Sequence, residues 1–227
     1  MILLVALLSA CFLISASLGS EEVVPTTPLP NINNQTMSKT QAIDFPDPCP
    51  RMQNGDVVLR EIQLPGSDTF KSVCVSLFYI GSGWLNVYRK LNSQTFNRTF
   101  DDYERGFGDV GTARHNEFFI GLNRLHQLTS GKPHEVLLSV RGRRLRKCDH
   151  FVVGDRSEGY KVKSIGNCTG SELWMIPKQD SKFSTLDRDE DGVPDRNFAK
   201  EEGYGWWFDP SMRPEVFRIN MSIRRTD

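Results

Sequence analysis

The segment between Cys148 and Cys168 limits the possible folds of this chain more than any other feature of the sequence. Two short apolar runs flank the triplet Ser-Glu-Gly at 157–159, which is typical of a three-residue hairpin loop with glycine at the position of positive φ. If Arg156 and Tyr160 close this loop, the antiparallel register places Cys148 directly opposite Cys168. Opposed residues of a non-hydrogen-bonded pair lie close enough to form a disulfide. We therefore expect a hairpin whose strands are joined by a Cys148–Cys168 bond.

The first 19 residues carry no charge, and the apolar run ILLVALLSACFLI is followed by small residues. This pattern is typical of a secretory signal peptide over residues 1–19, although the usual basic start is lacking. The run is too short for a comfortable membrane span and is soon followed by Glu21 and Glu22. We expect a secreted, extracellular protein without a membrane span, from which Cys11 is removed with the signal.

Cysteine number and glycosylation triplets agree with export. Four cysteines remain after the signal, and an even number in an exported chain suggests two disulfides. Asn-x-Ser/Thr triplets mark candidate glycosylation sites, although such triplets also arise by chance. The candidate sites are Asn34, Asn97, Asn167 and Asn220.

Composition divides the remaining chain into two parts. Residues 20–47 are rich in Pro, Thr and Asn with little apolar periodicity, which predicts a linker, and residues 48–227 are the expected domain. No Gly-X-Y repeat or heptad precedes the domain, so we expect a monomer or weak oligomer. The formal net charge is zero, with 28 basic and 28 acidic residues, which argues against a nucleic-acid or membrane-surface binder.

Apolar periodicity and turn residues predict both strands and helices in the domain. The clearest strand is the last, because apolar and polar residues alternate strictly along it. Helices are expected at 100–105 and from Leu122 to Gly131, where leucines recur on one face. The expected strands are 57–64, 73–80, 84–89, 136–140, 151–153, 160–162 and 217–224.

An acidic stretch stands out near the end of the chain. Its four aspartates are Asp187, Asp189, Asp191 and Asp195. Alternating aspartates followed by Gly192 are typical of a loop that wraps oxygen ligands around a calcium ion, while the alternative is a solvated acidic turn. An EF-hand is excluded, since its twelfth position requires Glu and holds Phe198 here. We therefore expect a calcium loop of another kind.

No set of catalytic residues emerges, so we expect a protein that is not an enzyme. The four histidines are isolated and lack zinc-type spacing, and no G-x-S-x-G motif is present. The basic run 141–147 is typical either of a polyanion-binding patch or of a solvated connection between strands, and we favour the connection.

Five blocks in the same order resemble the fibrinogen C-terminal domain, as found in ficolins, tachylectins and angiopoietin-like ligands. They are GSGWLNVYRK (81–90), FNRTFDDYERGFGD (96–109), EFFIGLNRLHQLT (117–129), FSTLDRDEDG (183–192) and GWWF (205–208). The resemblance implies an α+β domain with a central antiparallel sheet, short helices and a loop-rich calcium and ligand region. It also implies a Cys49–Cys74 disulfide.

The resemblance assigns the calcium ligands as well. Asp187 and Asp189 would supply side-chain oxygens, and backbone carbonyls from Asp191 to Val193 would complete the shell.

Two departures from the family affect its ligand pocket. The cysteines of the family's second disulfide are replaced by Phe198 and Ser211, and the segment before the last strand is nearly absent. Some residues of one pocket wall remain, although paired tryptophans also serve as core residues. The remaining wall would consist of Asn197, Phe198, Tyr204, Trp206 and Trp207. The Cys148–Cys168 pair, in contrast, lies outside the family pattern.

These features lead to two functional hypotheses. The first is a calcium-binding recognition protein that acts as a ligand or modulator of an extracellular protein. The alternative is a lectin of the innate-immune type that recognises acetylated or other carbohydrates. The shortened pocket favours the first.

Overall fold

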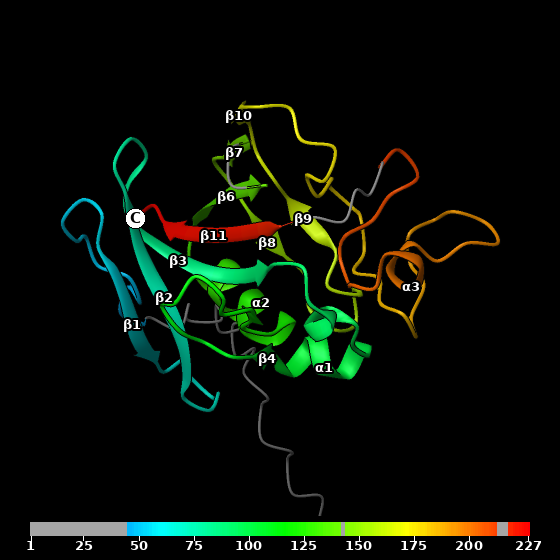
Figure 1. The fold of residues 1–227 in the computed structure, drawn as a ribbon, viewed down its shortest axis with the longest axis horizontal. Coiled ribbons are helices and arrows are strands. Elements are labelled where there is room, and N and C mark those ends of the chain that lie inside the picture. Colours follow the sequence, from blue (N-terminus) through cyan, green and yellow to red (C-terminus); the bar gives the residue numbers. More distant parts are fainter. Residues whose placement is uncertain (1–44, 142–143, 213–217) are drawn as a thin grey trace, which may run out of the picture. The chain divides into compact units, whose positions relative to one another are not determined.

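A long antiparallel sheet forms the centre of the domain (Figure 1). The computed structural model describes residues 45–141, 144–212 and 218–227. The predicted signal peptide, the predicted linker up to residue 44 and the candidate site Asn34 lie outside the described residues. The strands of the sheet follow the order β1-β2-β3-β11-β6-β7-β10. Their bounds are β1 Val57–Ile62, β2 Phe70–Leu77, β3 Gly81–Lys90, β11 Ile219–Arg225, β6 His134–Val140, β7 Arg144–Cys148 and β10 Cys168–Gly170.

Two-residue strands extend the sheet beside β3. Strand β5 (Phe118–Phe119) pairs with β3 and with β4 (Phe107–Gly108), and all of these pairings are antiparallel. Three helices accompany the sheet: α1 (Phe100–Arg105), α2 (Leu122–Gly131) and α3 (Phe198–Glu202). This architecture confirms the predicted α+β class.

The last strand lies in the middle of the sheet, between β3 and β6 (Figure 1). Its strict alternation explains that position. Ile219, Met221 and Ile223 are buried in the main core, while Asn220 points to the other face. The prediction of a strand here is confirmed, with the first residue at Ile219.

Helix α1 begins and ends where the sequence predicts. Thr99 accepts a hydrogen bond from the backbone N–H of Asp102, and the Asp102 carboxylate accepts from the Thr99 N–H. This reciprocal capping box satisfies two backbone donors at the helix start. Gly106, with φ of 89°, follows the last residue, and a Cβ there would meet the backbone of Ile120.

The hairpin before Cys168 has a longer loop than the sequence predicts. The N–H of Tyr160 donates to the carbonyl of Asp155 (2.9 Å), and Tyr160 itself has a positive φ of 49°. Tyr160 therefore belongs to the loop, which corrects the prediction that it starts a strand. The strands on either side of the loop are β8 (Val152–Val153) and β9 (Val162–Ser164).

A register shift in this hairpin offsets the longer loop. The shift lies between Val152 and Val153, after which Val152 pairs with Ser164. Further along, Cys148 pairs with Cys168, as predicted, and a disulfide joins them with a Cα–Cα distance of 4.1 Å. The prediction was thus wrong about the loop length. It was right about the cysteine pairing, because the register shift compensated for the longer loop.

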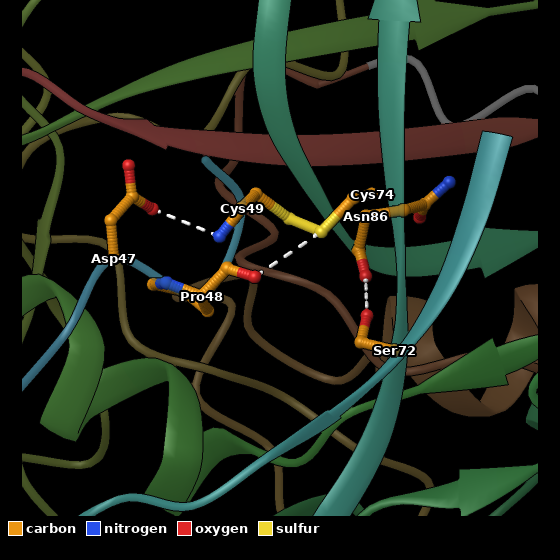
Figure 2. Close-up of a disulfide and its surroundings, with 6 residues drawn as sticks. All are labelled: Asp47, Pro48, Cys49, Ser72, Cys74 and Asn86. Carbon is orange, nitrogen blue, oxygen red and sulfur yellow. Dashed lines mark hydrogen bonds between the residues drawn. A yellow bond between two sulfur atoms is a disulfide. The ribbon is translucent and has the colours of Figure 1, made fainter. Parts of the chain in front are cut away.

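The second disulfide joins Cys49 to Cys74 in β2 (Figure 2). The Asp47 carboxylate accepts a hydrogen bond from the Cys49 N–H (2.9 Å), which fixes the chain that enters the domain. On β2, the Ser72 hydroxyl donates to the Asn86 carbonyl. Both cysteines are buried, so this bond ties the start of the domain to the sheet.

The basic run forms a strand rather than a connection between strands, which corrects our expectation for residues 144–147. Strand β7 has partners on both sides, β6 and β10, and these backbone pairings override the poor strand propensity of Arg and Lys. The Lys147 ammonium lies 3.1 Å from the buried Glu135 carboxylate. Residues 142–143 lie outside the described part of the chain.

In the described ranges, no helix has both the length and the apolar character needed to cross a membrane.

Candidate functional site: the acidic loop and the tryptophan pair

The acidic loop is fastened at its base to the segment that carries the tryptophans. Ser184 and Trp206 exchange two backbone hydrogen bonds, with N···O distances of 2.9 and 3.1 Å. A tight turn follows, in which Thr185 and Arg188 also pair. The Ser184 hydroxyl accepts from the N–H of Glu190 and so holds the far side of the turn. The candidate calcium and pocket residues therefore form one connected structure.

Asp187 is engaged by the start of helix α1. Its Oδ1 accepts the backbone N–H of Phe100 (2.9 Å) and the hydroxyl of Thr185 (2.7 Å). Phe100 is the first residue of α1, and helix N-termini leave backbone N–H groups that need acceptors. A carboxylate at this position also interacts favourably with the helix dipole. Asp187 thus has a structural partner 87 residues away in the sequence.

Asp191 is the buried aspartate of the loop, with a relative exposure of 2%. One carboxylate oxygen accepts the N–H of Val193 and the other accepts the N–H of Phe198, both at 2.8 Å. Asp191 therefore joins the acidic loop to helix α3.

Asp189 is exposed and is directed toward its neighbour. Its Oδ1 accepts the Asp191 N–H at 3.3 Å. Partial desolvation, together with the nearby Asp191 carboxylate, raises the pKa of Asp189. A cation beside the two carboxylates would remove this repulsion.

The donor set fits a calcium ion only in part. Among the described residues, no three or more Asp, Glu, His or Cys side chains gather as a metal site. The residues that fit are Asp189 and Asp191, with backbone carbonyls between Asp191 and Val193, because each carboxylate keeps free lone pairs. Asp187 and Asp191 each accept two hydrogen bonds, so Asp189 keeps the most free lone pairs. Asp187 bonds to Phe100 and Thr185 rather than to the Asp189–Asp191 pair, so we leave it out of the ligand set.

Glu190, the glutamate of the acidic loop, is paired with two nearby cations. Glu190 accepts from Lys182 (3.1 Å) and from the Arg188 guanidinium (3.0 Å). Burial opposes ionisation of Glu190, but these two cations hold its pKa below the usual value. The charge of Glu190 is thus balanced by two cations, whereas Asp189 lies beside another carboxylate.

Asn197 and Phe198 are used to build helix α3. The Asn197 carbonyl oxygen accepts from the N–H of Lys200, which caps the helix, and its amide donates to the Thr185 carbonyl. Phe198, which stands where the family has a cysteine, is buried with its ring 5.8 Å from that of Phe208. A packed ring here replaces part of the bracing that a disulfide would give.

The two tryptophans are completely buried, with relative exposures of 0%. The Trp206 indole N–H donates to the Met175 carbonyl (2.9 Å), and that of Trp207 donates to the Tyr160 carbonyl (2.7 Å). Their rings pack edge to face at a centroid distance of 5.4 Å. Both indoles are therefore satisfied inside the protein, which is the core role that the sequence left open.

Tyr204 completes this buried group. Its ring is 1% exposed and lies under the Lys90 ammonium, 4.9 Å from the ring centroid. Burial raises the pKa of the Tyr204 hydroxyl. All four aromatic residues of the predicted pocket wall thus face the interior, and only Asn197 is partly exposed.

Two tyrosines hold the tryptophan segment in place, and the sequence analysis did not single them out. The Tyr103 hydroxyl accepts from the Gly205 N–H (2.6 Å), and the Tyr88 hydroxyl donates to the Gly205 carbonyl (3.1 Å). A Cβ on Gly205 would lie 2.8 Å from the Tyr103 ring. In the sequence, the only indication of their role was that both tyrosines lie in the blocks that resemble the fibrinogen C-terminal domain.

A different concave feature, which the sequence analysis missed, lies on the sheet. We name it the outer hollow: a cavity of about 420 Å³ in the sheet, whose lining joins core residues such as Val73 and Ile219 to exposed ones such as Val57. Strands β1, β2, β3, β6 and β11 all contribute to its walls. Residues that line it include Val57, Val75, Leu77, Arg89, Arg114 and Asn220.

The three described glycosylation candidates occupy different surroundings. Asn97 and Asn167 are exposed, and Asn220 lies partly buried in the wall of the outer hollow. Thr99 of the Asn97 triplet caps helix α1. The Asn167 amide nitrogen is 3.5 Å from an Asp149 carboxylate oxygen.

The model of the family described as fibrinogen beta and gamma chains, C-terminal globular domain, matches residues 50–217. The chain belongs to this family. It is 32% identical to human fibrinogen-like protein 1 over 145 residues, which are 56% of this chain and 46% of that protein. It is 35% identical to the rat fibrinogen alpha chain over 170 residues, which are 69% of this chain and 21% of that one. The chain thus spans less than half the length of these curated relatives.

Solved structures show the same fold. The fibrinogen-like globe domain of human ANGPTL2 superposes with a TM-score of 0.62 and 21% identity, covering 76% of this chain and 94% of that one. The corresponding domain of human ANGPTL6 gives 0.61 and 23%, covering 76% and 90%. Lamprey fibrin D-dimer, complexed with the peptide Gly-His-Arg-Pro-amide, gives 0.60 and 18%, covering 76% and 70%.

Proposed function

We propose that this protein is a secreted recognition protein without enzymatic activity, whose ligand is another extracellular protein. The observation that carries the proposal is the burial of Phe198, Tyr204, Trp206 and Trp207. A carbohydrate site needs an aromatic platform and converging polar groups on a concave surface. Here the aromatic rings pack inside and the two indole N–H groups are bonded to backbone carbonyls, which supports a partner other than an acetylated sugar.

Membership of the family and its fold supports the recognition role. The lamprey fibrin D-dimer, which shares this fold, is a structure in complex with a short peptide, and this supports a protein or peptide ligand here. For this chain, a protein or peptide partner agrees with a surface that displays large apolar side chains. Phe78 and Tyr79, at the turn between β2 and β3, have relative exposures of 72% and 100%. Exposed aromatic residues of this kind often dominate the binding energy of protein interfaces.

We also propose that the acidic loop binds one calcium ion through Asp189, Asp191 and backbone carbonyls from Asp191 to Val193. When bound, the ion would offset the repulsion between the two carboxylates and hold the loop against the domain. Its role is structural, because Asp191 connects the loop to helix α3 and the aromatic rings nearby are buried.

Titration calorimetry with N-acetylglucosamine and with acetate tests the central proposal. We expect no binding at micromolar concentrations, with or without calcium. A glycan array probed with the secreted protein extends the test to other carbohydrates. Micromolar binding that disappears in Trp207→Ala, in protein shown to be folded, would refute the proposal and favour the lectin function.

A further inference from the structure

The outer hollow combines apolar walls with cationic side chains. Val57, with a relative exposure of 49%, and the partly exposed Val75 supply apolar wall, and Arg89 lines the same hollow. Arg89 donates to the Arg114 carbonyl (3.0 Å). None of the described residues that line the hollow is acidic. An exposed apolar concavity of this kind on a protein in solution needs an occupant or a cover.

Asn220 lies in the wall of this hollow and its amide is held in one orientation. Its Oδ1 accepts a hydrogen bond from the Asn86 Nδ2 at 2.7 Å. Its own Nδ2 donates to no described residue, and it is not among the buried polar atoms that lack a partner. The nitrogen that a glycan would use is therefore accessible from the hollow, while the oxygen is occupied.

We propose that Asn220 carries an N-linked glycan whose first sugar residues lie in the outer hollow and close it to protein partners. The proposal goes beyond the proposed function and shares with it only the export of the chain. It also separates Asn220 from Asn97, whose side chain is exposed and lies outside the hollow. A glycan on Asn97 would project into solvent.

The chemistry of the modification places it before folding. The Asn220 amide nitrogen attacks C1 of a lipid-diphosphate-linked oligosaccharide. The C1–N bond forms, the C1–O bond breaks, the amide loses one proton, and the lipid diphosphate leaves, without oxidation or reduction. Ser222 of the acceptor triplet has a relative exposure of 1% in the folded domain. The transferring enzyme therefore reaches the triplet only before β11 pairs with its neighbours.

A sugar residue is chemically suited to this cavity. One face of a pyranose ring presents C–H groups, which suit Val57 and Val75. Its hydroxyl and acetamido oxygens accept hydrogen bonds, which Arg89 and Arg114 can donate. The volume of about 420 Å³ falls within the range of small-molecule sites, about 300 to 1,000 Å³. The covalent link also gives the sugar a local concentration on the order of millimolar, so weak contacts suffice.

The first test uses the full chain secreted from a eukaryotic cell and treated with peptide N-glycosidase under native conditions. Glycopeptide mass spectrometry reports each site separately. We expect a glycan at Asn220 that is released at least about tenfold more slowly than the glycan at Asn97, equivalent to about 1.4 kcal/mol of local protection. After denaturation both glycans should be released at the same rate. Equal rates of glycan release at Asn220 and Asn97 in the native protein would overturn the proposal that the Asn220 glycan lies in the outer hollow.

The second test compares Ser222→Ala, which abolishes the acceptor triplet, with Ser222→Thr, which keeps it. We expect faster hydrogen exchange at the amides of β1 and β2 in the alanine variant only. Asn97→Gln is the control and should leave that exchange unchanged. A glycan on Asn97 but none on Asn220 refutes this inference alone, and the open hollow would then be a site for an anionic ligand. No glycan at any of the triplets also refutes this inference, while recovery of the chain from the culture medium reports export independently.

Discussion

The acidic loop and the outer hollow differ in how accessible their side chains are to a ligand. From the sequence, the loop looked like the more important binding site. The loop carries the residues that look most like a binding site, yet Asp187, Asp191 and Trp207 all direct their polar atoms to partners within the protein. The hollow carries only the common Asn-x-Ser triplet at Asn220, yet Val57 is 49% exposed there and the Asn220 amide nitrogen is not among the buried atoms that lack a partner. Much of the polar chemistry in the acidic loop is thus used to build the loop, and Asp189 is the aspartate of the Asp189–Asp191 pair with fewer internal hydrogen bonds.

The largest expected effect comes from removing a ring of the loop region. Trp207→Ala should lower the free energy of unfolding by about 3–5 kcal/mol, because it deletes a fully buried side chain and leaves a cavity. Trp174→Ala is the matched control, since Trp174 is 68% exposed, and its change should stay within about 0.5 kcal/mol. Urea unfolding followed by circular dichroism measures both. Similar values for the two variants would show that Trp207 packs less tightly than described.

Calcium should have the next largest effect. At 100 times its dissociation constant, a ligand bound only to the folded state raises the free energy of unfolding by about 2.7 kcal/mol. We expect the melting temperature to rise on addition of calcium and to fall again with a chelator. Asp189→Ala should lose most of this rise, because Asp189 has no other strong partner. Identical melting curves in calcium and chelator would leave the loop as a purely acidic turn.

In calcium-free solution, substitutions of Asp191 and Asp189 should change the free energy of unfolding differently, because only Asp191 accepts two backbone hydrogen bonds. Asp191→Ala should lower the free energy of unfolding by about 1–3 kcal/mol, since it leaves the backbone N–H groups of Val193 and Phe198 without acceptors. Asp189→Asn, in the same solution, should cost nothing or should stabilise the protein slightly, because it removes the repulsion that raises the pKa of Asp189. A loss for Asp189→Asn as large as for Asp191→Ala would contradict these roles.

The smallest effect is expected in the hollow. Arg114→Ala should change the free energy of unfolding by no more than about 0.5 kcal/mol, because Arg114 is exposed and the hydrogen bond from Arg89 goes to its backbone carbonyl, which remains. Urea unfolding of the glycosylated protein is the measurement. A fall in the free energy of unfolding of more than about 1 kcal/mol, twice the expected limit, would mean that Arg114 supports the fold rather than an occupant of the hollow.

Local sequence signals predicted the elements that local chemistry determines. Thr99 and Asp102 define the start of α1, and the alternation after Ile219 defines β11. Strand β7 was missed because its basic residues are poor local indicators, and only pairing with β6 and β10 makes them a strand. The hairpin loop was predicted one residue too short, since a register shift between Val152 and Val153 leaves no trace in the sequence.

The roles of the site residues depended on distant parts of the chain. Asp187 serves α1 because Phe100, 87 residues earlier, places its N–H against the carboxylate. Five strands contribute side chains to the outer hollow, so no single stretch of sequence marks it. In contrast, the spacing of Asp189 and Asp191 did identify the two carboxylates that lie near each other, and calcium binding by them stays a prediction.

The position of β11 has a consequence for synthesis on the ribosome. Strands β3 and β6 lie on either side of β11, and β11 is translated after every other strand of the sheet. Until it emerges, β3 and β6 each present an unpaired edge, which is the kind of surface that promotes aggregation. Both disulfides lie in the part translated earlier, so they can hold the two incomplete halves compact during this interval. We therefore expect oxidation of the cysteines to matter for the nascent chain before its central strand is available.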